Sequence, residues 1–260
     1  MTLPIVDFCG LKVARLIMGA NPLAGFSHQN PQRDAEMLAY YTIDRIIETW
    51  ERARAAGINT IVTNNETQHV HEALQRYLPG SGLQWIAQVR GLPTMEEGID
   101  EAVRIGCKAI YIHGALVDDA YSRQDSDTIG SWCDYARSAG VAAGVAGHAP
   151  EAHLWVNSLN VADFHAVCFF NCGSLHAGRG EKFDLKNMFA AVEAVRRIPK
   201  PCIAYKIMGA GRIDARMAFE YAFDSIKPTD VVNVGMHRGD RDDMVEANVA
   251  MVGEILAGKG

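Results

Sequence analysis

Short apolar runs recur along this chain, and each is followed by a segment whose apolar residues lie three or four positions apart. Most of the runs are continuous rather than alternating, which is typical of parallel strands covered by helices. The segments between them include IDRIIETWERARAAG and MEEGIDEAVRIG, which end at Gly, a usual stop for a helix. We predict strands over residues 15–21, 59–65, 84–90, 109–114, 141–148, 163–171, 202–211 and 230–237.

Eight alternations of strand and helix in a chain of 260 residues predict a (β/α)8 TIM barrel. An open, doubly wound sheet is the structural alternative, because it shows the same alternation. No Pro-, Gly- or Ser-rich linker and no low-complexity tract interrupts the pattern, so we expect a single domain over residues 1–260.

The composition narrows the class of partner. The chain is 48% hydrophobic and 22% charged, with a net charge of -6, and it has no Lys/Arg block, which argues against a nucleic-acid surface. No apolar run approaches the roughly 20 residues needed to cross a bilayer, and the first residues do not read as a signal peptide. We expect a cytoplasmic protein with a small-molecule substrate and no membrane partner. Exposed helix faces could support a homo-oligomer.

The six cysteines are scattered and form no CxxC motif. Reduced, mostly buried thiols are the expected state in such a chain. The spacing of Cys168 and Cys172 leaves a metal or redox pair open.

Polar side chains gather at the carboxyl ends of the predicted strands. In barrels of this kind the active site is built there, from the loops that follow the strands. Three histidines, a lysine, an arginine and several amides share this face, which indicates a site for a small polar substrate. The catalytic candidates are His113, His148 and Lys206, and the substrate-binding candidates are Asn21, Asn65, Glu66, Gln88, Arg90, Asn171 and His237.

His113 and His148 close neighbouring predicted strands, so their imidazoles could lie side by side. Imidazole titrates near neutrality and suits proton transfer. The same pair could instead hold a divalent metal together with Glu66, His69 or Asn171, although no HxH or HExxH spacing supports that hypothesis.

Lys206 falls inside the seventh predicted strand, in the apolar run CIAYKIMGAG. A lysine among apolar groups has a depressed pKa and could act as a base or form an imine. The alternative interpretation is a lysine paired with a neighbouring carboxylate.

Several of these segments resemble the aldo-keto reductases. FCGLKVARLIMGANPL is similar to that family's first strand and turn, GINTIVTN to its second strand, AIYIHG to its fourth, and DVVNVGMHRGDRDDMVEANVAMV to its last strand and helix. The resemblance covers most of the chain and implies the same barrel. It also implies a catalytic Asp, Tyr, Lys and His, whose positions here hold Val62, Thr67, Gln88 and His113. Thr and Gln are poor proton donors, so we expect the scaffold to be retained and the reductase chemistry to be lost.

The segment KIMGAGR, residues 206–212, could cradle a phosphate after the seventh strand. Gly209, Gly211 and Arg212 would contribute to it, and Arg238 could add charge from the loop after the eighth. The resemblance implies NADP as the cofactor, with Glu246 and Asn248 near adenine. A substrate phosphate, or a simple chain turn with a solvated helix face, would explain the same residues.

Two long loops, residues 22–41 and 172–187, could shape the pocket as lids. The leading interpretation is a barrel enzyme that acts on a small carbonyl or sugar-like substrate by acid/base chemistry of the lyase, isomerase or hydrolase type. A divalent metal could assist it. The alternative is an NADP-dependent oxidoreductase with a rebuilt proton donor. A third hypothesis is a non-catalytic ligand-binding barrel, which predicts a polar pocket without any group of shifted pKa.

Overall fold

The computed structural model describes residues 2–64, 66–171 and 183–259. Its central strands are β3 (Leu16–Gly19), β4 (Thr60–Asn64), β5 (Gln84–Val89), β6 (Ala109–Ile112), β7 (Ala142–Gly147), β8 (Phe164–Cys168), β9 (Cys202–Tyr205) and β10 (Val231–Gly235). They are parallel and close into a barrel in the order β10-β3-β4-β5-β6-β7-β8-β9. The predicted (β/α)8 barrel is confirmed, and the open-sheet alternative is wrong.

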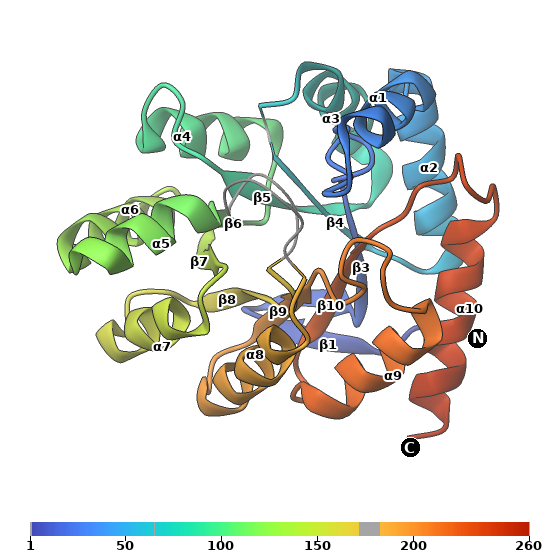
Figure 1. Cartoon of the computed structure of the whole chain (residues 1–260). Helices are drawn as coiled ribbons and strands as arrows, with labels where there is room; N and C mark the ends of the chain where they lie inside the picture. The colour runs from blue at the N-terminus through green and yellow to red at the C-terminus, as the bar shows by residue number, and fades with distance from the viewer. Residues whose placement is uncertain (1, 65, 172–182, 260) are drawn as a thin grey trace.

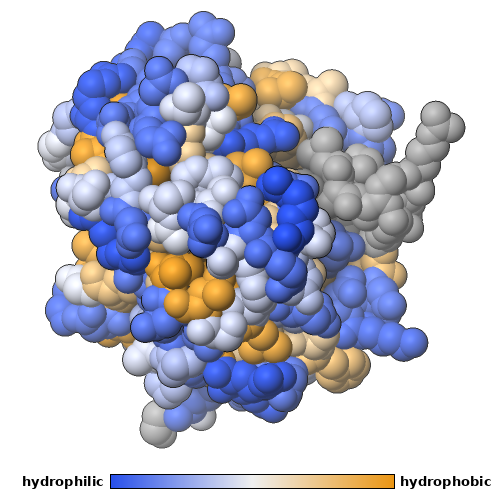
Figure 2. All heavy atoms as spheres, turned by 90° about the vertical axis from the view of Figure 1, so that its left-hand side faces the viewer, coloured by the Kyte–Doolittle hydropathy of each residue, from blue (hydrophilic) through white to orange (hydrophobic). Residues whose placement is uncertain are grey.

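Helices surround the barrel (Figure 1). They are α1 (Pro31–Tyr40), α2 (Ile43–Ala56), α3 (Gln68–Ser81), α4 (Met95–Ile105), α5 (Gly114–Arg123), α6 (Ser126–Ser138), α7 (Pro150–Leu159), α8 (Lys186–Arg197), α9 (Ala215–Ser225) and α10 (Met244–Ala257). Their outward faces are largely hydrophilic on the side of α4 to α7, with apolar atoms in small separate areas (Figure 2). No helix in the described ranges is long and apolar enough to cross a membrane.

The interior of the barrel is packed at its amino-terminal end. A hairpin of β1 (Ile5–Phe8) and β2 (Leu11–Ala14) places Phe8 among inward-facing side chains of the barrel strands. The Phe8 ring meets the Phe164 ring edge-on, with 5.1 Å between centroids. The apolar plug leaves only the opposite, carboxyl-terminal end of the barrel to hold a ligand, as expected for this fold.

Gly144 in β7 faces this plug, and we expect Gly144→Ala to destabilise the protein. An added Cβ would lie 2.4 Å from two ring atoms of Phe164. Overpacking of this kind costs about 1–3 kcal/mol in the free energy of unfolding, measurable by urea denaturation. Gly130→Ala on helix α6 is the matched control, because the nearest atom to a Cβ at that position belongs to Val161 and is 3.8 Å away. Equal stability of the two variants would contradict this packing.

Two sequence predictions need correction. The seventh strand ends at Tyr205 rather than Gly211, because residues 206–211 form a turn in which Lys206, Ala210 and two glycines have positive φ angles. The expected lid after the first strand is not all loop, since it contains helix α1. Asn30 caps that helix by accepting a hydrogen bond from the backbone N–H of Arg33.

Candidate active site

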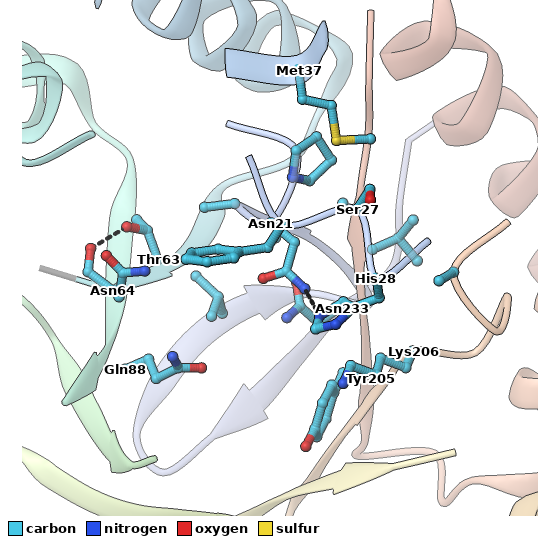
Figure 3. A pocket seen from close by; sticks show the side chains of 18 of the residues that line it. Asn21, Ser27, His28, Met37, Thr63, Asn64, Gln88, Tyr205, Lys206 and Asn233 are labelled. Atoms are coloured by element: carbon cyan, nitrogen blue, oxygen red, sulfur yellow. Dashed lines mark hydrogen bonds between the residues drawn. The ribbon is translucent and has the colours of Figure 1, made fainter. Parts of the chain in front are cut away.

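A cavity of about 490 Å³ opens at the carboxyl-terminal end of the barrel. The size suits a small-molecule ligand. Figure 3 shows side chains entering it from opposite walls, with Gln88 on β5 and Tyr205 on β9. The predicted site residues that line the cavity are Asn21, Glu66, Gln88, Arg90, His113, His148, Lys206, Gly211 and His237.

Other predicted residues lie elsewhere or outside the described ranges. Asn171, Gly209, Arg212 and Arg238 do not line this cavity. The Arg238 guanidinium is buried and donates to Glu48, Thr49 and Asp242, so its expected role in phosphate binding is wrong in this structure. Asn65, Cys172 and most of the second predicted lid, residues 172–182, are outside the part of the chain that the structure describes.

His148 is held by a carboxylate that the sequence reasoning missed. Asp118 on α5 accepts from His148 Nδ1 at 2.7 Å and from the backbone N–H of His148 at 3.1 Å. Burial would raise the pKa of Asp118, but these bonds, the His148 charge and the Ala149 N–H hold it below its usual value. An ionised carboxylate only accepts, so whenever the His148 ring carries a single proton, that proton lies on Nδ1 and the lone pair is on Nε2.

His113 has the opposite arrangement. Its Nδ1 accepts from the backbone N–H of Ala115 at 3.2 Å and caps helix α5. Burial and the charges of Arg90, His148 and Lys206 lower the pKa of His113 to about 4. The Asp118 charge raises this pKa, but by less. The imidazole is therefore neutral at pH 7, with its proton on Nε2, and is a hydrogen-bond donor rather than a base.

A buried tyrosine, Tyr111, and a partly buried one, Tyr205, line the cavity. Tyr111 donates its O–H to Gln88 Oε1 at 3.1 Å, which directs the two N–H groups of that amide away from the tyrosine. Tyr205 donates to the carbonyl of Gly147 at 3.2 Å. Burial raises the pKa of both phenols above the usual value, so neither is an effective proton donor.

The Gly147 carbonyl, directly before His148, also accepts from His153 Nε2 at 3.3 Å. His153 Nδ1 in turn lies 3.2 Å from His165 Nδ1. Since the neutral His153 ring donates its single N–H to the Gly147 carbonyl, His153 Nδ1 must accept, and the N–H between the two rings is on His165 Nδ1. This buried chain fixes the backbone from which the His148 side chain projects.

Lys206 lies after the strand and not within it, in a left-handed conformation with φ of 55°. Its Nζ is 5.9 Å from the centroid of the Tyr205 ring. The side chain is only partly buried, so the expectation of a lysine enclosed by apolar strand residues is wrong. Within the described ranges it has no carboxylate partner either, and it lines the cavity.

The loop after β3 covers part of the mouth. Gln29 Nε2 donates to the carbonyl of Ala210 in the loop after β9 at 2.9 Å, and Arg212 reaches the carbonyl of His28 at 3.4 Å. Arg33 forms an ion pair with Asp240 in the loop after β10. These contacts join the loops after β3, β9 and β10 on the side of the cavity where the sequence analysis expected a cofactor phosphate.

Two further findings bear on metal and thiol chemistry. Among residues 2–64, 66–171 and 183–259, no group of three or more His, Cys, Asp or Glu side chains could hold a metal. No disulfide joins the five cysteines in those ranges to one another.

Gly114→Ala is expected to disturb the site without unfolding the protein. A Cβ at Gly114 would lie 2.9 Å from His148 Cε1 and 3.2 Å from Nδ1, so the imidazole would have to move away from Asp118. A displacement near 1 Å at a reacting group can cost about 10²-fold in rate. The measurement is kcat together with the melting temperature, with Gly130→Ala as the control. A fully active Gly114→Ala would show that His148 need not occupy this position.

Strand alternation could have identified three of the missed residues. Tyr111 and Tyr205 lie two positions after Ala109 and Ile203, which also face the barrel interior. Asn233 lies two positions after Val231 in the same way, and its Oδ1 has no partner among the described residues. Nothing in the sequence around Asp118 distinguishes it from Asp119, so only the fold identifies it as the partner of His148.

Neither a family model nor a curated protein sequence matches this chain. Solved structures do resemble it over nearly its whole length. A candidate aldo-keto reductase from Pseudomonas aeruginosa has a TM-score of 0.68 at 19% identity, covering 97% of this chain and 94% of that one. The 3-hexulose-6-phosphate synthase of Salmonella typhimurium has a TM-score of 0.61 at 14% identity, covering 95% and 100%.

A truncated 3-deoxy-D-arabino-heptulosonate 7-phosphate synthase from Thermotoga maritima is also similar, with a TM-score of 0.60 at 11% identity over 98% and 92% of the chains. The chain is a TIM barrel. At these identities the likeness shows the fold alone, which the chain shares with the candidate reductase and with the synthases.

Proposed function

We propose that this protein is a barrel enzyme that moves a proton on the carbon skeleton of a small hydroxy-carbonyl or sugar-like substrate, as in an isomerase or lyase. The observation that carries the proposal is the pair of imidazoles at the ends of β6 and β7. Asp118 makes His148 Nε2 a base, and the Ala115 N–H makes His113 Nε2 a donor. Neighbouring groups with opposed acid/base roles are characteristic of proton-transfer sites.

In the proposed first step, His148 Nε2 takes a proton from the carbon next to the substrate carbonyl. The electron pair of that C–H bond moves to the carbonyl oxygen and forms an enediolate. His113 Nε2–H and the oriented amide of Gln88 donate hydrogen bonds to that oxygen. Donors fixed in advance, in a partly desolvated cavity, stabilise developing charge more than water does.

The second step decides the reaction class. In an isomerase, His148 returns the proton to the former carbonyl carbon while the hydroxyl proton passes from the neighbouring oxygen to the former carbonyl oxygen, which makes the neighbouring carbon the new carbonyl. In a lyase, the enediolate re-forms the carbonyl or a double bond as a leaving group on the next carbon departs with the electron pair of its bond. The names of two solved structures with this fold, both sugar-phosphate synthases, support carbonyl chemistry in such a barrel.

Within the described part of the chain, no phenol stands where the reductases have their proton-donating Tyr. Val62 and Gln88 line the cavity where the family has its Asp and Lys, and Thr67 precedes helix α3. The raised pKa values of Tyr111 and Tyr205 argue against either phenol replacing the missing one. The non-catalytic alternative is disfavoured because His113, in the cavity, has a strongly lowered pKa.

Exchange of substrate protons with solvent tests the proposal. A panel of small aldoses, ketoses and hydroxy-carbonyl acids is incubated with the protein in D2O, and loss of the C–H signal beside the carbonyl is followed by NMR. We expect enzyme-dependent exchange with at least one class and its loss in His148→Gln. Exchange that survives in His148→Gln, or NADPH oxidation by a carbonyl compound in place of exchange, would overturn the proposal.

A further inference from the structure

We propose that the substrate carries an oxyanion, a carboxylate or phosphate group, which is bound between Arg90 and Lys206 beside His113. This inference deepens the proposed function by naming the chemical class of the substrate, and it concerns binding rather than the proton transfer itself.

Two cations that line the cavity near the imidazoles form no ion pair with the described residues. On the side of the loops after β3 and β10, Arg33 is paired with Asp240 and Glu36. On the other side, Arg90 and Lys206 have no hydrogen bond or ion pair with any residue in the described ranges, although Lys206 Nζ lies 5.9 Å from the centroid of the Tyr205 ring. The only carboxylate that lines that part of the cavity within those ranges is Glu66, which is exposed at the rim. Glu66 forms no ion pair with Arg90, although the Arg90 charge lowers the pKa of Glu66 against the larger effect of burial.

These two cations line the cavity although the chain as a whole has a net charge of -6. Arg90 is exposed and Lys206 is partly buried, so water solvates both charges, and an anionic ligand that replaced this water could pair with both. Asp118 accepts from His148 and from backbone N–H groups and forms no ion pair with Arg90 or Lys206.

The backbone around Lys206 supports a role for the position. A lysine at φ of 55° lies in the left-handed region, which is uncommon for a residue with a Cβ and is enriched at functional sites. The turn places the lysine at the cavity wall together with Ile207, Met208 and Gly211, whereas a continued strand would carry it along the barrel axis.

The same two cations repel the protonated form of His113. A bound anion would cancel part of this repulsion, and by reciprocity its affinity would rise when His113 is protonated. Binding should therefore raise the pKa of His113, a change that a merely non-specific surface anion would not produce.

The test is equilibrium binding of two probes, inorganic phosphate and oxalate, to the full chain at constant ionic strength. Calorimetry gives the affinity, and the His113 ring signal in NMR gives its pKa with and without probe. We expect saturable binding of at least one probe, with a higher pKa for His113 in the complex. Tighter phosphate binding would indicate a phosphorylated substrate, and tighter oxalate binding an acid.

Variants make the assignment specific. Arg90→Gln and Lys206→Met are each expected to weaken binding at least tenfold. Arg76→Gln on α3 and Lys12→Met on the β1–β2 hairpin remove the same charge away from the cavity and should bind as the wild type does. No saturable binding, or equal binding by all variants, would overturn the inference. Because no turnover is measured, this result is separate from the proton-exchange test of the proposed function.

Discussion

Replacing His148 by Gln is expected to lower kcat by a factor of about 10²–10⁴ on any substrate that the proton-exchange screen identifies. A positioned general base contributes a rate factor of that size. The His148 side chain is only 9% exposed and is held by Asp118, so it is oriented before substrate binds. Gln can still donate to Asp118 but has no basic nitrogen, and for that reason the variant should fold and bind while losing catalysis.

The split between kcat and KM separates this role from a structural one. In His148→Gln, kcat should fall while KM and the melting temperature stay near their wild-type values. Asp118→Asn should lower kcat as well, because an amide no longer enforces the proton on Nδ1. His71→Gln on α3, away from the cavity, is the control. If His148→Gln kept the wild-type kcat, His148 would not be the base.

Acidification is expected to destabilise the protein through its buried imidazoles. His153 is fully buried between α7 and the barrel, and burial lowers its pKa to about 4 from an ordinary value of 6.5. Between these pH values the unfolded chain binds a proton that the folded protein does not, so stability is fully present above pH 6.5 and falls as the pH drops toward 4. For His153 alone, the loss between about pH 7.5 and pH 5 is roughly 2 kcal/mol.

Burial acts in the same direction on His165, its neighbour, and on His113, so the total loss should exceed this figure. The measurement is the free energy of unfolding in urea at several pH values. His153→Gln isolates the contribution of His153 to the pH-dependent loss of stability. The Gln amide can donate to the Gly147 carbonyl and accept from His165, but it does not titrate. Between about pH 7.5 and pH 5, we expect the free energy of unfolding of His153→Gln to fall by about 2 kcal/mol less than that of the wild type. His71→Gln should show the wild-type fall. Identical slopes for His153→Gln and wild type would contradict the buried neutral state.

The positions of the strand ends followed from the hydrophobic pattern. Continuous apolar runs are what a strand with both faces covered requires, and parallel strands place their carboxyl ends together. Gln88, His113, His148 and His237 could therefore be assigned to one face before any coordinates were known. The pattern failed at Lys206, because an apolar run does not show where a chain leaves the sheet. Positive φ angles at Lys206 and Ala210 end β9 early, and neither residue type signals such a turn.

The sequence by itself determined the barrel, its single apolar interior and the end at which polar chemistry gathers, because these depend on periodicities of two and 3.6 residues. Only the tertiary structure decided the roles of individual groups. Asp118 reaches His148 across 30 positions of chain, and Arg238 turns away to Glu48 on α2. Proton positions, local charge and burial arise from such contacts between distant segments, and no local pattern encodes them.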